Sequence, residues 1–364
     1  MSKTHIIAAL DGDGIGPEIM AVALEALAIV GKQSGVTFDV RHAPFGGQAY
    51  FDTGSAFPEA TKKVCDEADA ILKGPIGLSF EESKKIPIDE QPERGALLPL
   101  RKRYNTFANF RPVYLPAELA HFSPLKPHAV AGGIDIMIIR ELVGGLYFGE
   151  KERGVRNGLR YVKETLEYDE DQIKRILEVG FEEARKRKKV LHNVHKSNVL
   201  KSSVLWNEVL DEVAPGYPDV QVKHVIVDAA ATALVLNPRQ FDVMVMENMF
   251  GDILSDLGGG ILGSLGLMPS ACVGTKGSYY EPSHGSAPDI AGMGIANPYS
   301  MIGSVAMMLE KSFGMDAEAR RLWDAMRFVF GQGFTTADLR DPEGKLKPVS
   351  TREFADKVLA KLAG

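Results

Sequence analysis

Two aspartates four residues apart, Asp252 and Asp256, carry the strongest chemical signal in the sequence. On a helix, side chains at this spacing lie on one face, with Cβ atoms about 5–6 Å apart. Two carboxylates at that distance repel each other unless a cation lies between them, and their oxygen atoms suit Mg²⁺ or Mn²⁺. An acidic pair on a solvated helix is the commoner explanation of the spacing alone. Here, however, segment 249–254 leaves little polar surface around the pair, which favours a metal site.

A second group of candidate residues lies in the small-residue segment 281–298. Small residues let a flat ring or a phosphate approach the backbone closely, and a histidine such as His284 can stack on a ring. Asp289 is suited to bind a ribose 2′-hydroxyl and would repel a 2′-phosphate, which favours NAD over NADP. Taken alone, the segment is as typical of a cluster of turns as of a cofactor site. The candidate cofactor contacts here are His284, Gly285, Ser286, Ala287, Asp289, Ile290 and Asn297.

The glycine-rich segment 11–18 suggests a dinucleotide-binding loop, but its spacing excludes the Rossmann fingerprint. That fingerprint requires a glycine at the position where this chain has Pro17. An EF-hand loop is excluded as well, because Ile15 stands at a ligand position. We expect a tight strand-to-helix turn with Pro17 at the first helical position, in which Ile15 can still touch a cofactor.

Three arginines beside apolar runs, Arg101, Arg111 and Arg140, are candidate substrate-binding residues. A guanidinium group matches a carboxylate in geometry, so three converging arginines would bind a dicarboxylate. Each alone is more typical of a surface or ion-paired arginine, and the sequence does not show convergence. Tyr147 and Lys196 are the candidate acid–base residues, although each alone is more typical of a structural or surface position.

The composition is that of a soluble globular enzyme. The chain has 364 residues, which exceeds the usual single-core limit of about 250–300 residues, so two domains or lobes are expected. The formal net charge is −6, with both signs mixed along the chain, which argues against a nucleic-acid-binding surface. We expect the basic run 185–189 to be the cationic end of a helix rather than a targeting or nucleic-acid patch.

Cysteine content and hydropathy exclude further protein classes. Two cysteines are too few for a disulfide framework or a zinc ribbon. His192 and His195 lie in a strand-like run and would face opposite sides, which argues against zinc. We find no signal peptide and no run of about 18 apolar residues, so we expect no membrane span and a reducing cytoplasm.

Short apolar runs alternate with helical patterns, which predicts an α/β architecture with a largely central sheet. The predicted strands are His5–Leu10, Ala70–Leu72, Ile134–Ile139, Val190–Val194, His224–Val227 and Phe241–Met246. The predicted helices are Gly16–Lys32, Asp169–Arg187, Ser202–Val213 and Pro298–Phe313. Asp169 and Gln172 resemble a capping box at the start of the second helix. The polar, irregular segment 147–169 predicts a protruding hairpin or arm.

Taken together, these motifs resemble the β-decarboxylating dehydrogenases of the isocitrate and isopropylmalate group over essentially the whole chain. The segments that carry the resemblance are Gln91–Lys102, Gly251–Asp256 and His284–Asn297. The resemblance implies a two-lobed α/β fold that is not a Rossmann fold. The first lobe would combine residues 1–107 with 263–364, and the second would comprise 108–262 with a dimerisation arm at about 147–169. A homodimer with shared active sites is implied too, without nucleic-acid or membrane partners.

The resemblance also implies roles for the candidate residues. The carboxylates of a malate substrate would be bound by Arg101, Arg111 and Arg140, and its side group would face Glu93, Leu97 and Leu98. Mg²⁺ or Mn²⁺ would be held by Asp252, Asp256 and the partner subunit's Asp228. Protons would be transferred by Tyr147 and the partner subunit's Lys196. The nucleotide would lie against the segment from His284 to Asn297, in which Asp289 and Ile290 form the NAD-type pattern.

Leu97 and Leu98 favour an alkyl substituent on the substrate, because an apolar wall would leave a third carboxylate desolvated and unpaired. We therefore expect NAD-dependent oxidative decarboxylation of (2R,3S)-3-isopropylmalate, a step of leucine biosynthesis. Departures from the family pattern put this substituent in doubt; they are Asp11, Lys73, His195 and Ala229. The alternatives are the same chemistry on homoisocitrate, tartrate or another 3-substituted malate, and a non-catalytic metal- or nucleotide-binding relative.

Overall fold

The computed structural model describes residues 3–339 and 347–364 and divides into two compact units. Unit 1 comprises residues 1–106, 121–124 and 262–364, and unit 2 comprises 107–120 and 125–261. In the described residues, no helix is both long enough and apolar enough to cross a membrane. The domain boundaries expected from the sequence stay a prediction.

Unit 1 is built on strands in the order β2-β1-β3-β12-β11, of which only the β11–β12 pair is antiparallel. These strands are β1 (Thr4–Leu10), β2 (Thr37–His42), β3 (Ala70–Lys73), β11 (Pro269–Val273) and β12 (Ser278–Pro282). The short β13 (Phe334–Thr335) and β14 (Lys347–Pro348) pair separately. The helices are α1 (Gly16–Ser34), α2 (Gly47–Thr53), α3 (Glu59–Glu67), α4 (Phe80–Ser83), α5 (Leu98–Tyr104), α11 (Tyr299–Phe313), α12 (Asp316–Gly331) and α13 (Thr351–Ala363).

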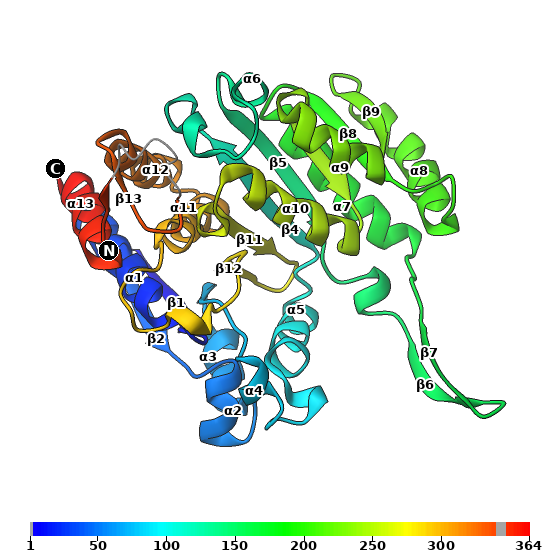
Figure 1. The fold of residues 1–364 in the computed structure, drawn as a ribbon, viewed down its shortest axis with the longest axis horizontal. Helices are drawn as coiled ribbons and strands as arrows, with labels where there is room; N and C mark the ends of the chain where they lie inside the picture. Colours follow the sequence, from blue (N-terminus) through cyan, green and yellow to red (C-terminus); the bar gives the residue numbers. More distant parts are fainter. Residues whose placement is uncertain (1–2, 340–346) are drawn as a thin grey trace. The chain divides into compact units, whose positions relative to one another are not determined.

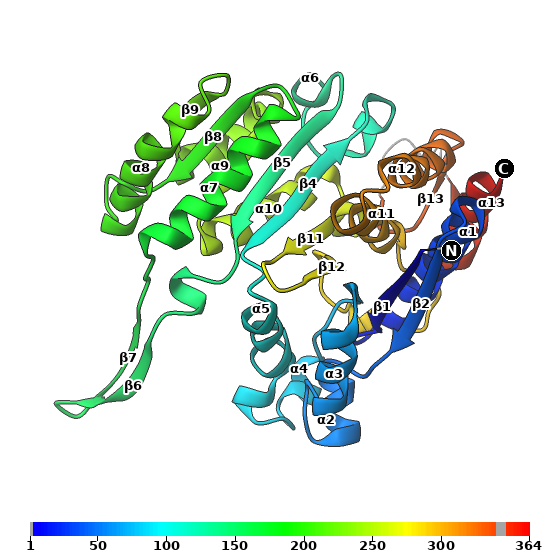
Figure 2. The same cartoon turned by 180° about the vertical axis from the view of Figure 1, so that it is seen from behind.

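The core of unit 1 forms where α11 packs against β3, β11 and β12. Residues 299–309 of this helix are all buried, because α1 and α12 pack beside it and α13 packs against α1 and α12 (Figure 2). The two cysteines, Cys65 and Cys272, are both buried. Burial raises the pKa of the Cys65 thiol to about 12, so this residue behaves as a small apolar side chain.

Unit 2 contains a second run of strands in the order β4-β5-β10-β8-β9, in which only the β4–β5 pair is antiparallel. The strands are β4 (Ala108–Leu115), β5 (Ile134–Glu141), β8 (Val190–His195), β9 (Gln221–Ile226) and β10 (Val243–Met246). The helices are α6 (Pro127–Val130), α7 (Glu170–Arg185), α8 (Lys201–Val213), α9 (Val227–Leu236) and α10 (Asn248–Leu262). Helix α7 packs on β5, β8 and β10, and α9 packs on β8 and β9 (Figure 1).

The predicted hairpin is present in unit 2. Strands β6 (Lys151–Arg156) and β7 (Leu159–Glu164) pair only with each other and extend as a thin ribbon beyond the helices of the unit (Figure 1). Its apolar side chains Val155, Leu159 and Val162 are exposed.

The predicted elements are confirmed, with ends that coincide or differ by at most three residues. The capping box is present, since the Asp169 side chain accepts from Gln172 N and the Gln172 side chain accepts from Asp169 N. The basic run at the end of α7 is ion-paired, with Arg185 bound to Asp219 and Arg187 to Asp242. The strand predicted at 224–227 is wrong at its end, because residue 227 begins helix α9.

Candidate active site

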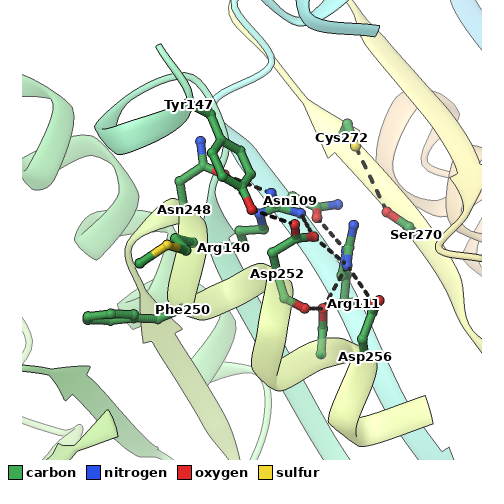
Figure 3. A network of polar contacts seen from close by, with 12 residues as sticks. Asn109, Arg111, Arg140, Tyr147, Asn248, Phe250, Asp252, Asp256, Ser270 and Cys272 are labelled. Atoms are coloured by element: carbon green, nitrogen blue, oxygen red, sulfur yellow. Dashed lines mark hydrogen bonds and ion pairs between the residues drawn. The ribbon is translucent and has the colours of Figure 1, made fainter. Parts of the chain in front are cut away.

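The candidate metal ligands lie at the start of α10, which directly follows β10. The helix begins here because the Glu247 carboxylate accepts hydrogen bonds from the backbone N–H groups of Phe250 (3.0 Å) and Met249 (3.3 Å). As predicted, Asp252 and Asp256 are helical and one turn apart. Both carboxylates face the same arginine, Arg111 (Figure 3).

Asp252 is the centre of the polar network. The Tyr147 hydroxyl donates to its Oδ2 at 2.9 Å, and Arg140 Nη1 donates to its Oδ1. Arg111 Nη1 lies 3.5 Å from the same oxygen and 3.4 Å from Asp256 Oδ1. The structure therefore brings together five predicted site residues that lie up to 145 positions apart in sequence (Figure 3).

Strand pairing explains this convergence. Arg140 lies opposite Asn109 in the antiparallel β4–β5 pair and opposite Met246 in the parallel β5–β10 pair. Helix α10 begins two residues after Met246, so its first turns start beside the Arg140 backbone. Arg111 follows two residues after Asn109 on β4, and alternate residues of a strand project from the same face.

Three further polar residues hold the arginines, and the sequence interpretation assigned them no role. Asn248 Oδ1 accepts from Arg140 Nε (3.0 Å) and Nη2 (2.8 Å). Asn109 Oδ1 accepts from Arg111 Nε (2.8 Å), and Ser255 Oγ accepts from Arg111 Nη1 (2.7 Å). The Arg140 side chain is 1% exposed and that of Arg111 6% exposed. The i, i+4, i+8 spacing of Asn248 with the two aspartates was the available signal.

The residues at this point fit a hard divalent cation. Partial burial raises the pKa of the Asp256 carboxyl, the Asp252 carboxylate raises it further, and Arg111 acts in the opposite direction. A second negative charge is therefore unfavourable here, and a cation between the two carboxylates would remove that cost. Within one chain, no three His, Cys, Asp or Glu residues of the described part cluster as metal ligands. Asp228 is thus not brought to Asp252 and Asp256 within one chain.

The predicted residues Lys196 and Asp228 form their own pair at the ends of β8 and β9. Lys196 Nζ donates to Asp228 Oδ1 at 2.6 Å, and this hydrogen bond lowers the pKa of the Asp228 carboxyl. The Asp228 side chain is 69% exposed, so the pair is open to solvent.

The candidate cofactor residues lie in unit 1, where backbone packing dictates the glycines of segment 11–16. Gly12 and Gly14 have positive φ angles. A Cβ on Gly12 would lie 2.2 Å from Pro75 O, and one on Gly14 would lie 2.1 Å from Ser286 O. Ile15 N donates to Ser286 O (2.9 Å), which joins this turn to the predicted cofactor segment. Pro17 is the second residue of α1, one position later than expected, because the helix begins at Gly16.

One residue of this turn with no predicted role, Asp13, ties it to two neighbouring loops. Its buried carboxylate accepts from the backbone N–H groups of Gly47, Gln48 and Gly77, each at 2.9 Å. Gly77 O in turn accepts from Ser286 Oγ at 2.7 Å. Three loops at the carboxyl ends of strands are therefore fixed against one another, which is where open α/β sheets bind ligands.

The residues of the predicted cofactor segment 284–297 lie in unit 1 as follows. His284 Nε2 lies 2.8 Å from Ser300 Oγ, and burial lowers the pKa of this histidine. Asp289 is exposed, and a Cβ on Gly285 would meet open space. Asn297 Oδ1 accepts from Tyr299 N (3.0 Å) at the start of α11, which gives it a structural function as well. The cofactor contacts of Ala287 and Ile290 stay predictions.

The other predicted substrate residues also belong to unit 1. Arg101 is buried and its Nε donates to Tyr279 Oη at 3.1 Å. Leu97 and Leu98 are half-buried where a π-helical turn (Pro92–Leu97) meets α5, and Glu93 is exposed. Their roles in substrate binding stay predictions.

Lys73, whose position departs from the family pattern, forms a buried ion pair. Its side chain is 1% exposed, and its Nζ lies 2.5 Å from Glu281 Oε2 and 2.9 Å from Gly74 O. Both ends of this pair are inside unit 1, at the ends of β3 and β12. In this structure Lys73 is thus engaged by Glu281 rather than presented to a ligand.

We expect Gly251→Ala to destabilise the protein by about 1–3 kcal/mol and to displace Arg140, because the new Cβ would overpack the site. That Cβ would lie 2.5 Å from Arg140 Cγ. Gly260→Ala is the matched control on the same helix, since nothing lies within 4 Å of its Cβ. The control should gain about 0.5–1 kcal/mol from helix propensity. Urea unfolding measures both, and equal effects would contradict the close approach.

Comparisons with known proteins identify the family of the chain. A family model described as isocitrate/isopropylmalate dehydrogenase matches residues 6–358. The chain is 48% identical over 365 residues to a 3-isopropylmalate dehydrogenase of Geobacter sulfurreducens, covering 100% of both chains. It is 47% identical over 362 residues to that of Aquifex aeolicus, covering 99% of this chain and 98% of the relative. Among solved structures, an isocitrate dehydrogenase of Methylococcus capsulatus is 32% identical with a TM-score of 0.86, covering 99% of this chain and 100% of that one. The chain belongs to the isocitrate/isopropylmalate dehydrogenase family.

Proposed function

We propose that this enzyme catalyses the NAD- and divalent-metal-dependent oxidative decarboxylation of 3-isopropylmalate to 2-oxo-4-methylpentanoate, a step of leucine biosynthesis in the cytoplasm. The observation that carries the proposal is the convergence of Arg111, Arg140 and Tyr147 on Asp252. Relatives named 3-isopropylmalate dehydrogenase, similar over the full chain, support the choice of substrate.

The arginines are suited to bind a carboxylate of the substrate. Each arginine is fixed by a hydrogen bond from its Nε, that of Arg111 to Asn109 and that of Arg140 to Asn248. Because the side chains are already ordered, little side-chain entropy is lost when a ligand binds. A bound cation held by Asp252 and Asp256 would supply Lewis-acid stabilisation of negative charge on the substrate's oxygen atoms. NAD, held by the segment 284–297, would accept the hydride that leaves C2.

Two residues handle the protons of the reaction. The partner's Lys196 takes the proton of the 2-hydroxyl as C2 is oxidised. The resulting β-keto acid loses CO₂, and Tyr147 gives a proton to the carbon from which CO₂ departed. The proton on the Tyr147 hydroxyl is held by Asp252 Oδ2 in this structure, which orients the phenol toward the site.

We propose a homodimer in which each active site is shared. The support is that Lys196 and Asp228 pair with each other and form no cluster with Asp252 and Asp256 in the described part of one chain. The exposed apolar residues of the β6–β7 ribbon are suited to be covered by the partner.

A steady-state comparison of 3-isopropylmalate, homoisocitrate, isocitrate and tartrate tests the substrate. We expect 3-isopropylmalate to have the highest kcat/KM, because an alkyl group loses little by leaving water and a carboxylate loses much. The departures at His195 and Ala229 make homoisocitrate or tartrate the competing substrates, and a higher kcat/KM for either would contradict the proposal. Comparison of NAD⁺ with NADP⁺ tests Asp289, since NADP⁺ preference would remove its role.

A further inference from the structure

Tyr168 stands where the chain returns from the β6–β7 ribbon to the body of unit 2, and no role in the reaction has been given to it. Its side chain is buried, and its ring lies against the turn Gly144–Gly145. A Cβ on Gly144 would lie 2.6 Å from Tyr168 Cε1, and one on Gly145 would lie 2.5 Å from its hydroxyl oxygen. Only glycines therefore permit this approach.

The Tyr168 hydroxyl joins three segments of the site. It donates to Glu141 Oε2 at 3.1 Å and accepts from the backbone N–H of Asn248 at 3.0 Å. Glu141, which is fully buried at the end of β5, also accepts from Val143 N (3.0 Å) and Gly144 N (2.8 Å). One phenol thus links the end of β5, the first residue of α10 and the Gly144–Gly145 turn.

Each of these segments carries a group of the active site. The turn 145–147 ends in Tyr147, whose hydroxyl donates to Asp252. The Oδ1 atom of Asn248 accepts hydrogen bonds from two N–H groups of Arg140. Its Nδ2 donates to Gly144 O at 2.9 Å. Tyr168 is therefore connected to Arg140 through Asn248, and to Tyr147 through the Gly144–Gly145 turn. Figure 3 shows Asn248, Arg140 and Tyr147 beside Asp252.

The base of the ribbon is fastened to the same turn. Gly145 N donates to Glu167 O at 3.0 Å, and a Cβ on Gly149 would lie only 1.8 Å from Thr165 O. Any movement of the ribbon's base must consequently be transmitted to the residues on either side of Tyr147.

We propose that Tyr168 is a positioning residue. Through it, the position of the base of the β6–β7 ribbon determines the positions of the Tyr147 and Arg140 side chains. This inference rests on the proposed function for its catalytic consequence, and on contacts within unit 2 for its structural part. Without the hydroxyl, Asn248 N–H loses its acceptor and Glu141 loses a donor, so the start of α10 and the Gly144–Gly145 turn loosen together.

The test compares Tyr168→Phe with Tyr217→Phe in the full-length protein. The first variant keeps the Tyr168 ring and removes only its hydroxyl. The second removes the same group from Tyr217, whose ring stacks on Phe181 of α7 with the ring centroids 4.5 Å apart. We expect Tyr168→Phe to lower kcat with 3-isopropylmalate by about 10–100-fold, as outer-shell substitutions do, with KM for NAD⁺ changed less than twofold. Tyr217→Phe should keep the kcat of the unmodified protein.

Backbone hydrogen exchange supplies a readout that needs no turnover. Exchange at Asn248 and over residues 144–149 should rise in Tyr168→Phe, and exchange in α8 should stay unchanged. Unchanged exchange at Asn248 and 144–149 would overturn the proposal, as would an equal loss of kcat in both variants or a loss confined to KM for NAD⁺. If no malate yields NADH, the proposed function fails, and the exchange data still decide whether Tyr168 positions these segments.

Discussion

Asp252→Asn should lower kcat/KM for the 2-hydroxy acid substrate by at least about 10²–10³-fold, the usual loss when one preorganised electrostatic contact is removed. Asp252 accepts from Tyr147, Arg140 and Arg111, and its carboxylate is 35% exposed, so it is accessible to a cation. The amide keeps the shape of the side chain but has one donor group in place of an acceptor oxygen. Its NH₂ group would face either the arginines or the Tyr147 hydroxyl.

Thermal unfolding with and without Mn²⁺ separates the metal role from the arrangement of the arginines. A ligand that binds only the folded protein stabilises it by about 2.7 kcal/mol at one hundred times its Kd. We expect this stabilisation in the unmodified protein and its loss in Asp252→Asn. The control is Asp211→Asn on α8, where an exposed carboxylate is replaced in the same way. Full activity or undiminished Mn²⁺ stabilisation in Asp252→Asn would rule out Asp252 as a ligand.

The elements that carry periodic signals were predictable from the sequence. Helix α7 has a single apolar stripe and a capping box, and both the helix and the box are present. Helix α9 was not predicted, because its apolar residues 227–236 are not confined to one stripe and directly follow strand residues. Its start was therefore assigned to β9. Apolar content decides that a segment is buried, but only periodicity distinguishes a short helix from a strand.

The site was predictable in its charged residues and not in the neutral ones that hold them. Arg111, Arg140 and the two aspartates have residue types and spacing that indicate chemistry. Asn109 has neither, and the spacing of Asn248 with the two aspartates places all three on one helix face without indicating that Asn248 binds Arg140. What brings Asn248 to Arg140 is the register of β5 on β10, which places Arg140 opposite Met246, two residues before Asn248. Register depends on pairing between distant segments, so it becomes visible only in the folded structure.

Lys73 is a charged residue whose partner the sequence did not indicate. The sequence marks it only as a departure from the family pattern. In the structure it is buried beside Glu281, so its charge is compensated inside unit 1. A buried ion pair of this kind is costly to break from one side, since the remaining charge stays uncompensated.

Heterodimers that combine Tyr147→Phe with Lys196→Met should recover activity that neither homodimer has. In the proposed shared site, Tyr147 comes from one subunit and Lys196 from its partner. A heterodimer then has one site with both defects and one site with none. Purified through two different affinity tags, it should show about half the kcat per dimer of the unmodified protein, because two-fold symmetry creates two equivalent sites.

The matched control pairs two defects that the proposal places in the same half of the site. Tyr147→Phe and Asp252→Asn remove groups that contact each other within one chain, at 2.9 Å. Every site of their heterodimer therefore carries one defect, and activity should stay at the level of the homodimers. Combining Tyr147→Phe with Asp228→Asn should instead restore about half of the kcat per dimer. The reason is that Asp228 accepts a hydrogen bond from Lys196 at 2.6 Å and so belongs to the same half of the site as Lys196. No recovery in the two other pairings would place all of these groups in one chain, and would remove the reason for Lys196 and Asp228 to lie apart from the aspartates of α10. Recovery in the Asp252→Asn pairing would instead place Tyr147 and Asp252 of one site in different chains.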